Sequence, residues 1–144
     1  MSEPEFYPMP LFVRLAVRDV AASARGYEQA LGFRSVYALP RADGMQVMNH
    51  IRLGRYQDLM LVADMPGATE SSKGQGVVIN LTLDRDVDNL AQQARSASAK
   101  VKGPTNTQWN TRELTVRDPD GYLLTFSQVV DPNRDFDDVM SNFG

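Results

Sequence analysis

The sequence contains no cysteine, which excludes disulfide bonds, thiolate metal sites and cysteine nucleophiles. It has one histidine and one tryptophan in 144 residues. No apolar run reaches the roughly 18 residues that a membrane-spanning helix needs. The opening residues lack the basic and apolar regions of a signal peptide. We therefore expect a cytoplasmic protein with no membrane contact.

Neither sign of charge is present in large excess. The 15 lysines and arginines are scattered and are outnumbered by 18 acidic residues, so that the net charge is −3. A nucleic-acid partner is therefore not expected. A hydrophobic content of 42% with 23% charged residues is typical of a soluble globular protein, and residues 1–144 have the length of one domain with a real core.

The first half of the chain has the pattern of a strand, a helix and three strands. Val13, Leu15 and Val17 share one face of the first strand. Asp19 is placed to cap the following helix, and Gly32 to end it. The three later strands are predicted in the stretches FRSVYAL, MQVMNHIRLG and DLMLVAD.

The same order returns in the second half. Residues 65–76 are rich in glycine and small polar residues and are predicted to be a linker. A strand follows, then a helix capped by Asp86, a short strand in KVKGP, and a hairpin closed by Asp-Pro-Asp-Gly. The chain therefore contains two βαβββ modules, at residues 10–64 and 77–128. The acidic tail at 129–144 has three interpretations: a short helix that folds back, an arm that binds a partner, or a loosely packed terminus.

Three stretches together resemble the vicinal oxygen chelate superfamily: VRLAVRDVAASARGYEQALGF, LTLDRDVDNLAQQARSASAKV and WNTRELTVRDPDGYLLTF. The superfamily includes glyoxalase I, extradiol dioxygenases and bleomycin-resistance proteins, and the third stretch is most similar to the bleomycin-resistance branch. The resemblance implies an α+β fold in which two tandem βαβββ modules form a curved mixed sheet around a cleft. It also implies a homodimer.

Metal-dependent members of that superfamily hold a divalent ion with His, Glu or Gln at four strand positions. The resemblance places these positions at Phe12, Val78, Thr125 and either Met60 or Val62. The apolar side chains offer no ligand atom, and a threonine hydroxyl is a weak neutral ligand. We therefore expect no metal and no other cofactor.

The faces of the strands suggest which residues would line the cleft. Because the residues opposite the core positions face the other way, we predict a largely apolar site for a small hydrophobic or aromatic ligand. Trp109 at its rim could stack on a planar ring. Arg112 and Glu113 are neighbours on one strand, so only one of them can enter the cleft. The predicted ligand-binding residues are Phe12, Arg14, Met48, His50, Arg52, Met60, Val62, Asn80, Trp109 and Thr125.

Three functions are consistent with these patterns. The favoured hypothesis is a metal-independent protein that sequesters an antibiotic or secondary metabolite without turnover, as the resemblance implies. The second is a superfamily enzyme, in which His50 acts as a base while Arg14 or Arg52 holds an anion, or in which a divalent metal is bound. For His50 we favour a partly exposed polar residue of the cleft wall. The third is a regulatory module whose acidic tail binds a partner.

Overall fold

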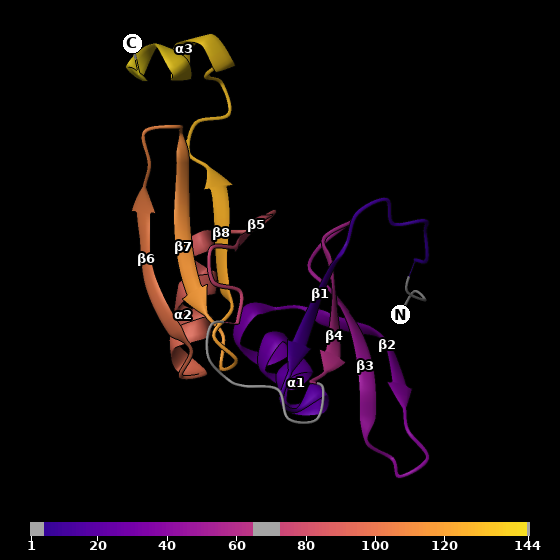
Figure 1. The fold of residues 1–144 in the computed structure, drawn as a ribbon. Helices are drawn as coiled ribbons and strands as arrows, with labels where there is room; N and C mark the ends of the chain where they lie inside the picture. The colour runs from indigo at the N-terminus through magenta and orange to yellow at the C-terminus, as the bar shows by residue number, and fades with distance from the viewer. Residues whose placement is uncertain (1–4, 65–72, 144) are drawn as a thin grey trace. The chain divides into compact units, whose positions relative to one another are not determined.

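The computed structural model describes residues 5–64 and 73–143. The chain divides into two compact units, Met1–Ser71 and Ser72–Gly144, each with its own sheet and helix (Figure 1). The first unit contains β1 (Val13–Val17), α1 (Val20–Leu31), β2 (Arg34–Pro40), β3 (Gln46–Arg52) and β4 (Asp58–Ala63). The second unit contains β5 (Val78–Thr82), α2 (Val87–Ser96), β6 (Lys100–Asn106), β7 (Thr111–Arg117), β8 (Leu123–Val129), α3 (Phe136–Met140) and the 3₁₀ helix η1 (Ser141–Phe143).

The two sheets have the same topology. Their strand orders are β1-β4-β3-β2 and β5-β8-β7-β6. In each sheet the first and last strands of the module pair in parallel, and the other neighbours pair antiparallel. The predicted α+β fold with two tandem βαβββ modules is therefore confirmed.

Both main helices begin where the sequence predicts. The side chain of Asp19 accepts a hydrogen bond from the backbone N–H of Ala22, 3.0 Å away, and Asp86 caps α2 through the N–H of Asp88 at 3.1 Å. Gly32 ends α1 in the left-handed conformation, with φ of 77°, which glycine adopts without a steric penalty.

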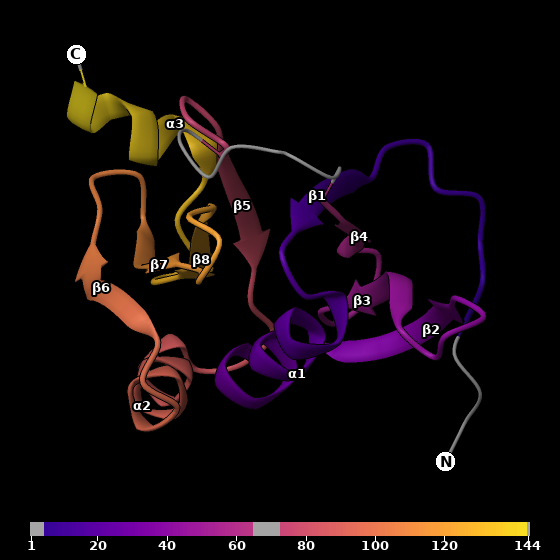
Figure 2. The ribbon, with the colours of Figure 1, turned by 60° about the horizontal axis from the view of Figure 1, so that its bottom comes forward.

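Each helix covers one face of its own sheet, and the core of each unit lies between them (Figure 2). Under α1 the sheet contributes Leu15, Val17, Ile51, Leu59 and Leu61, all buried. Under α2 it contributes Leu81, Leu114, Val116, Leu124 and Phe126, also buried. Each such side chain contributes roughly 1.5–3 kcal/mol through burial. The opposite face of each sheet, which no helix of its own unit covers, is called the open face below.

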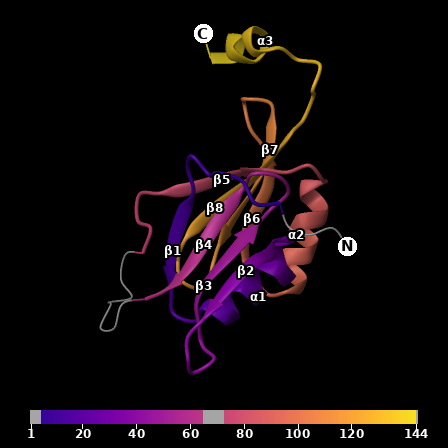
Figure 3. The same ribbon diagram turned by 90° about the vertical axis from the view of Figure 1, so that its right-hand side faces the viewer.

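Three details differ from the sequence-based expectations or fall outside them. Strand β6 extends to Asn106, beyond the predicted KVKGP stretch. Most of the predicted linker lies outside the described residues, and residues 73–76 form a turn. The tail forms α3 and η1, which lie near the loop between β6 and β7 (Figure 3). In the described part of the chain, no helix has the length and apolar character needed to cross a membrane.

Candidate functional site

The open face of the first sheet brings together the site residues predicted in the first module. Arg14 of β1 is opposite Met60 of β4, which is in turn opposite His50 of β3. Met48 and Val62 are paired in the next row. Phe12 continues the alternation of β1 one residue before the strand begins and is exposed. These residues share a face because side chains alternate along each strand.

A buried polar cluster occupies one end of this face. The carboxylate of Asp58 accepts hydrogen bonds from Nε of Arg52 and from Nε2 of His50, each 2.7 Å from Oδ1. Its other oxygen, Oδ2, accepts the phenolic O–H of Tyr7. His50 is 5% exposed, so the expectation that it is a partly exposed wall residue is wrong. The reason is the hydrogen bond from His50 to Asp58, which makes His50 part of the buried cluster that Asp58 forms with Arg52.

Hydrogen bonds set the pKa values of Asp58 and Tyr7 in this cluster. Burial alone would raise the pKa of Asp58, but the donors Tyr7, Arg52 and His50 stabilise the carboxylate and bring its pKa below the ordinary value. Burial and the hydrogen bond to Asp58 raise the pKa of Tyr7 to about 12. The cluster therefore holds an ionised carboxylate and a neutral phenol near pH 7.

Tyr7 belongs to the N-terminal segment, defined here as residues 5–12, which forms neither helix nor strand. The segment runs on the side of the first sheet away from α1 (Figure 2). Nη1 of Arg52 donates to the backbone oxygen of Glu5 at 2.7 Å, and the guanidinium carbon of Arg52 lies 5.1 Å from the centre of the Tyr7 ring. The edge of that ring meets Tyr56, with centroids 4.7 Å apart. Side chains thus attach the segment to the open face.

The open face of the second sheet is built in the same way and also carries polar side chains. Asn80 of β5 is opposite Thr125 of β8, and Thr125 is opposite Thr115 of β7. Thr125 is buried at 7% exposed, whereas Asn80 is exposed. The two predicted site residues of this sheet, Asn80 and Thr125, are therefore direct neighbours.

Trp109 lies in the loop between β6 and β7 and is 53% exposed. Its indole N–H donates to Oε2 of Glu113 at 3.1 Å, and the hydroxyl of Thr111 donates to the same oxygen at 2.8 Å. Glu113 lies on the open face, since it alternates with the buried Leu114. The ring of Phe143 stacks on the indole, with centroids 6.3 Å apart and planes at 20°. Trp109 is thus held in one orientation at the surface of the second unit.

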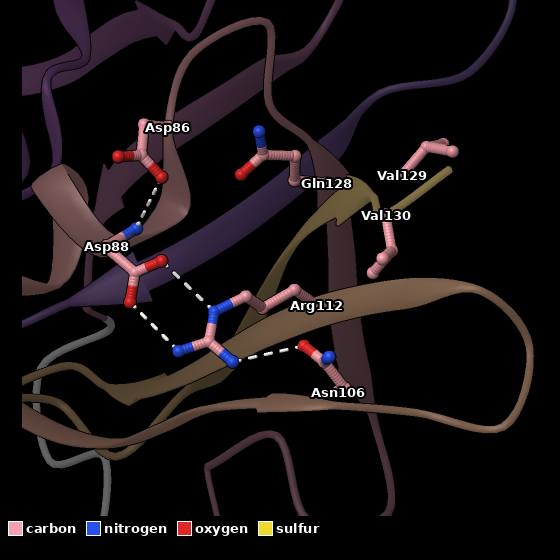
Figure 4. A pocket seen from close by; sticks show the side chains of 7 residues that line it. All are labelled: Asp86, Asp88, Asn106, Arg112, Gln128, Val129 and Val130. Atoms are coloured by element: carbon pink, nitrogen blue, oxygen red, sulfur yellow. Dashed lines mark hydrogen bonds and ion pairs between the residues drawn. The ribbon is translucent and has the colours of Figure 1, made fainter. Parts of the chain in front are cut away.

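Arg112 points to the opposite side of β7, towards α2 (Figure 4). Its guanidinium binds both oxygens of Asp88, at 3.0 and 2.9 Å, and the side chain of Asn106 at 3.0 Å. The bond from Arg112 lowers the pKa of Asp88. An open hollow of about 390 Å³ surrounds this pair, lined by Asp86, Asp88, Asn106, Arg112, Gln128, Val129 and Val130. Because Asp88 already neutralises Arg112, this arginine offers little to an anionic ligand.

The residues at the four metal-binding positions of the superfamily do not fit a divalent ion. The resemblance assigns these positions to Phe12, just before β1, to Met60 or Val62 on β4, to Val78 on β5 and to Thr125 on β8. The nearby Asp58 carboxylate is occupied by three hydrogen-bond donors. Over residues 5–64 and 73–143, no three His, Cys, Asp or Glu side chains are grouped so that they could hold an ion.

Sequence reasoning missed Asp58 and Tyr7 and left Glu113 undecided. A signal for Asp58 was present, because it stands two residues before Met60 and therefore shares its face. Tyr7 had no such signal, since it precedes the first strand and meets Asp58 across 51 positions of the chain.

Comparisons with known proteins agree with this geometry. A sequence model of the Glyoxalase/Bleomycin resistance protein/Dioxygenase superfamily matches residues 10–126. The structure is similar to TioX from Micromonospora sp. ML1, with 22% identity, a TM-score of 0.67, and coverage of 83% of this chain and 97% of that one. It is also similar to TnmS3, an antibiotic binding protein from Streptomyces sp. CB03234, with 26% identity, a TM-score of 0.62, and coverage of 82% and 93%.

A glyoxalase-related enzyme from Clostridium phytofermentans has the same fold at 12% identity, with a TM-score of 0.64 and coverage of 86% of this chain and 97% of that one. No curated protein matches the chain. Solved structures with this fold thus include both an antibiotic binding protein and a glyoxalase-related enzyme, so the fold alone does not assign a function.

Proposed function

The chain belongs to the glyoxalase/bleomycin resistance protein/dioxygenase superfamily, and from this premise we propose that it binds an antibiotic or secondary metabolite without a metal. It acts by sequestration, so that one bound compound is removed from solution and none is converted.

The observation that carries this proposal is the orientation of Trp109. Its indole N–H is fixed on Glu113 and its ring is 53% exposed. An exposed, oriented aromatic ring can stack on a planar ligand, and such a pair contributes about 0.5–1.5 kcal/mol beyond the buried area. The similarity to the antibiotic binding protein TnmS3 also supports the proposal that this chain binds such a compound.

Two further observations support binding rather than metal chemistry. The positions at which the resemblance expects metal ligands carry Phe12, Met60 or Val62, Val78 and Thr125, whose side chains supply no carboxylate or imidazole. Met48 and Met60 lie on the open face of the first sheet, where flexible thioether side chains adapt to an irregular ligand.

We also propose a homodimer, which light scattering after size-exclusion chromatography would detect as twice the 16.0 kDa chain mass.

A thermal-shift titration of chelator-treated protein tests the proposal. The compounds are daunorubicin, which has a planar aromatic ring system, and bleomycin, which carries a planar aromatic bithiazole; the ions Mg²⁺, Mn²⁺, Fe²⁺, Ni²⁺ and Zn²⁺ are titrated separately from them. A compound at 100 times its dissociation constant should stabilise the fold by about 2.7 kcal/mol, and chromatography should recover it unchanged. A saturable one-site shift with a metal ion, or conversion of the compound, would contradict sequestration.

The role of Trp109 is tested by calorimetry on a matched pair of variants. Trp109→Leu should weaken binding of the stabilising antibiotic two- to tenfold, corresponding to the loss of about 0.5–1.5 kcal/mol. Phe136→Leu is the control, because Phe136 is an aromatic residue of the same unit that is 75% exposed. Equal affinities of the two variants would remove Trp109 from the ligand site.

One observation favours a second candidate function. Asp58 orients His50 through a 2.7 Å hydrogen bond, and a histidine held by a carboxylate is a common arrangement in acid–base catalysis. In this case the protein is an enzyme of the superfamily with His50 as its base. His50→Ala tests this candidate, because it should abolish turnover by an enzyme that uses His50 as its base, whereas a sequestering protein converts no compound with or without His50.

A further inference from the structure

The phenol of Tyr7 is bound to the first unit as a ligand would be. The O–H donates to Asp58, the ring lies over the Arg52 guanidinium at 5.1 Å, and its edge meets the Tyr56 ring at 4.7 Å. A polar atom, a cationic contact and an aromatic contact thus converge on a single aromatic side chain. A few polar groups placed to fix the orientation of an aromatic ring are typical of a small-molecule site.

The groups that receive Tyr7 belong to the sheet, whereas Tyr7 does not. Arg52 and Asp58 are a cross-strand pair of β3 and β4, with side chains 3% and 2% exposed. Their positions are set by the ladder and by their mutual hydrogen bond. Tyr7 stands in the N-terminal segment, which forms neither helix nor strand and is attached through Glu5 and Tyr7. The segment can therefore leave without breaking the sheet.

We infer that the end of the first open face formed by His50, Arg52, Tyr56 and Asp58 is a binding site for a neutral phenol, and that Tyr7 occupies it in place of the ligand. The inference deepens the proposed function and rests on it for the biological ligand, which would be a compound with an aromatic hydroxyl group. A ligand phenol takes the position of the Tyr7 ring, and the N-terminal segment is displaced.

The charges of the cluster define the ligand class. The positive charge of Arg52 is balanced by Asp58, so the site gives no net attraction to an anion. An ionised carboxylate only accepts hydrogen bonds. The ligand must therefore donate a hydrogen bond to Asp58. It must also present the face of an aromatic ring to the Arg52 guanidinium, which the ring attracts. An aromatic ether has the ring without the donor, and a benzoate has a second negative charge facing Asp58, so both should bind more weakly than the phenol.

The test uses p-cresol, which has the structure of the tyrosine side chain, and 4-methylanisole, in which the hydroxyl hydrogen is replaced by a methyl group. Affinities for both are measured by NMR titration on the full chain. The proteins are the wild type, Tyr7→Ala, and Phe6→Ala as matched control, since Phe6 is the preceding residue of the same segment and is 67% exposed.

Tyr7→Ala should bind p-cresol at least tenfold more tightly than the wild type and Phe6→Ala, and at least tenfold more tightly than it binds 4-methylanisole. No gain for p-cresol, or equal binding of the two compounds, would overturn the inference. If Tyr7→Ala does not fold, Tyr7→Phe keeps the ring and loses only the hydroxyl group. It should show a smaller gain of the same sign, and a Tyr7→Phe variant with no gain would overturn the inference.

This experiment is independent of the antibiotic titration. If the wild type binds an antibiotic while Tyr7→Ala gains no affinity for p-cresol, the phenol site is wrong and the proposed function stands. If no antibiotic or phenol binds to any of the proteins, both are wrong.

Discussion

Trp109 and Phe143 stack at the surface of the second unit, with ring centroids 6.3 Å apart and planes inclined by 20°. The tail therefore contains a short helix, as one of the three interpretations expected, and its Phe143 contacts a loop of its own unit. Asn110 reinforces this arrangement, because its side chain donates to the backbone oxygen of Asp131 at 2.7 Å and accepts from the N–H of Asp131 at 3.0 Å.

Phe143→Ala should expose the indole of Trp109 further. Because Trp109 is the only tryptophan, tryptophan fluorescence reports on the surroundings of this one indole. We expect a red-shifted emission and stronger quenching by acrylamide than in the wild type. Phe136→Ala, a substitution of another exposed phenylalanine of the tail, should leave both unchanged, and an equal effect of the two variants would exclude the stacked arrangement in solution.

Asp58→Asn should destabilise the first unit strongly. It leaves the guanidinium of Arg52 buried without its counterion, and breaking a buried ion pair in this way typically costs about 3–5 kcal/mol. Chemical denaturation would measure the free energy of unfolding. Asp43→Asn is the control, because Asp43 pairs with Arg41 at the surface, where ion pairs contribute little. Similar midpoints for Asp58→Asn and wild type would show that the buried pair is not formed.

Acid should weaken the fold through the same residue. The pKa of Asp58 is lower in the folded chain than its ordinary value of 3.8, so the unfolded chain takes up the proton first as the pH falls. The stabilisation is complete above the ordinary value and is lost as the pH falls through the folded pKa. Between pH 5 and about pH 3 the wild type should lose more stability than Asp58→Asn. Parallel loss in the two proteins would assign the acid sensitivity to other carboxylates, such as Asp88, whose pKa is also lowered.

Gly103→Ala should destabilise the second unit more than Gly121→Ala. Both glycines have positive φ, 97° and 101°, a conformation that costs other residues about 1–3 kcal/mol. At Gly103 an added Cβ would also lie 2.9 Å from the backbone oxygen of Glu113, whereas at Gly121 it would meet nothing within 4 Å. Thermal denaturation of the two variants isolates this clash, and equal melting temperatures would mean that the strand relaxes around it.

Most of the fold could be predicted from local patterns. The alternation of Val13, Leu15 and Val17 assigned the faces of β1, and the capping residues Asp19 and Asp86 marked where the helices begin. The end of β6 was not predictable in the same way, because its last residues are held by pairing with β7, as in Asn106 opposite Arg112. Pairing between strands depends on the whole sheet and not on the residues of one strand.

Residue types and their order were enough to predict the two modules, the faces of their strands and the residues at the positions where metal ligands were expected. These follow from residue type and from a side-chain period of two, both of which are local. Three contacts follow only from the tertiary structure: the hydrogen bond from Tyr7 to Asp58, the ion pair of Arg112 with Asp88, and the stacking of Phe143 on Trp109. In each case the partners are separated by 24 to 51 positions of the chain, and no local pattern specifies which distant side chain will meet a given charge or ring when the chain folds.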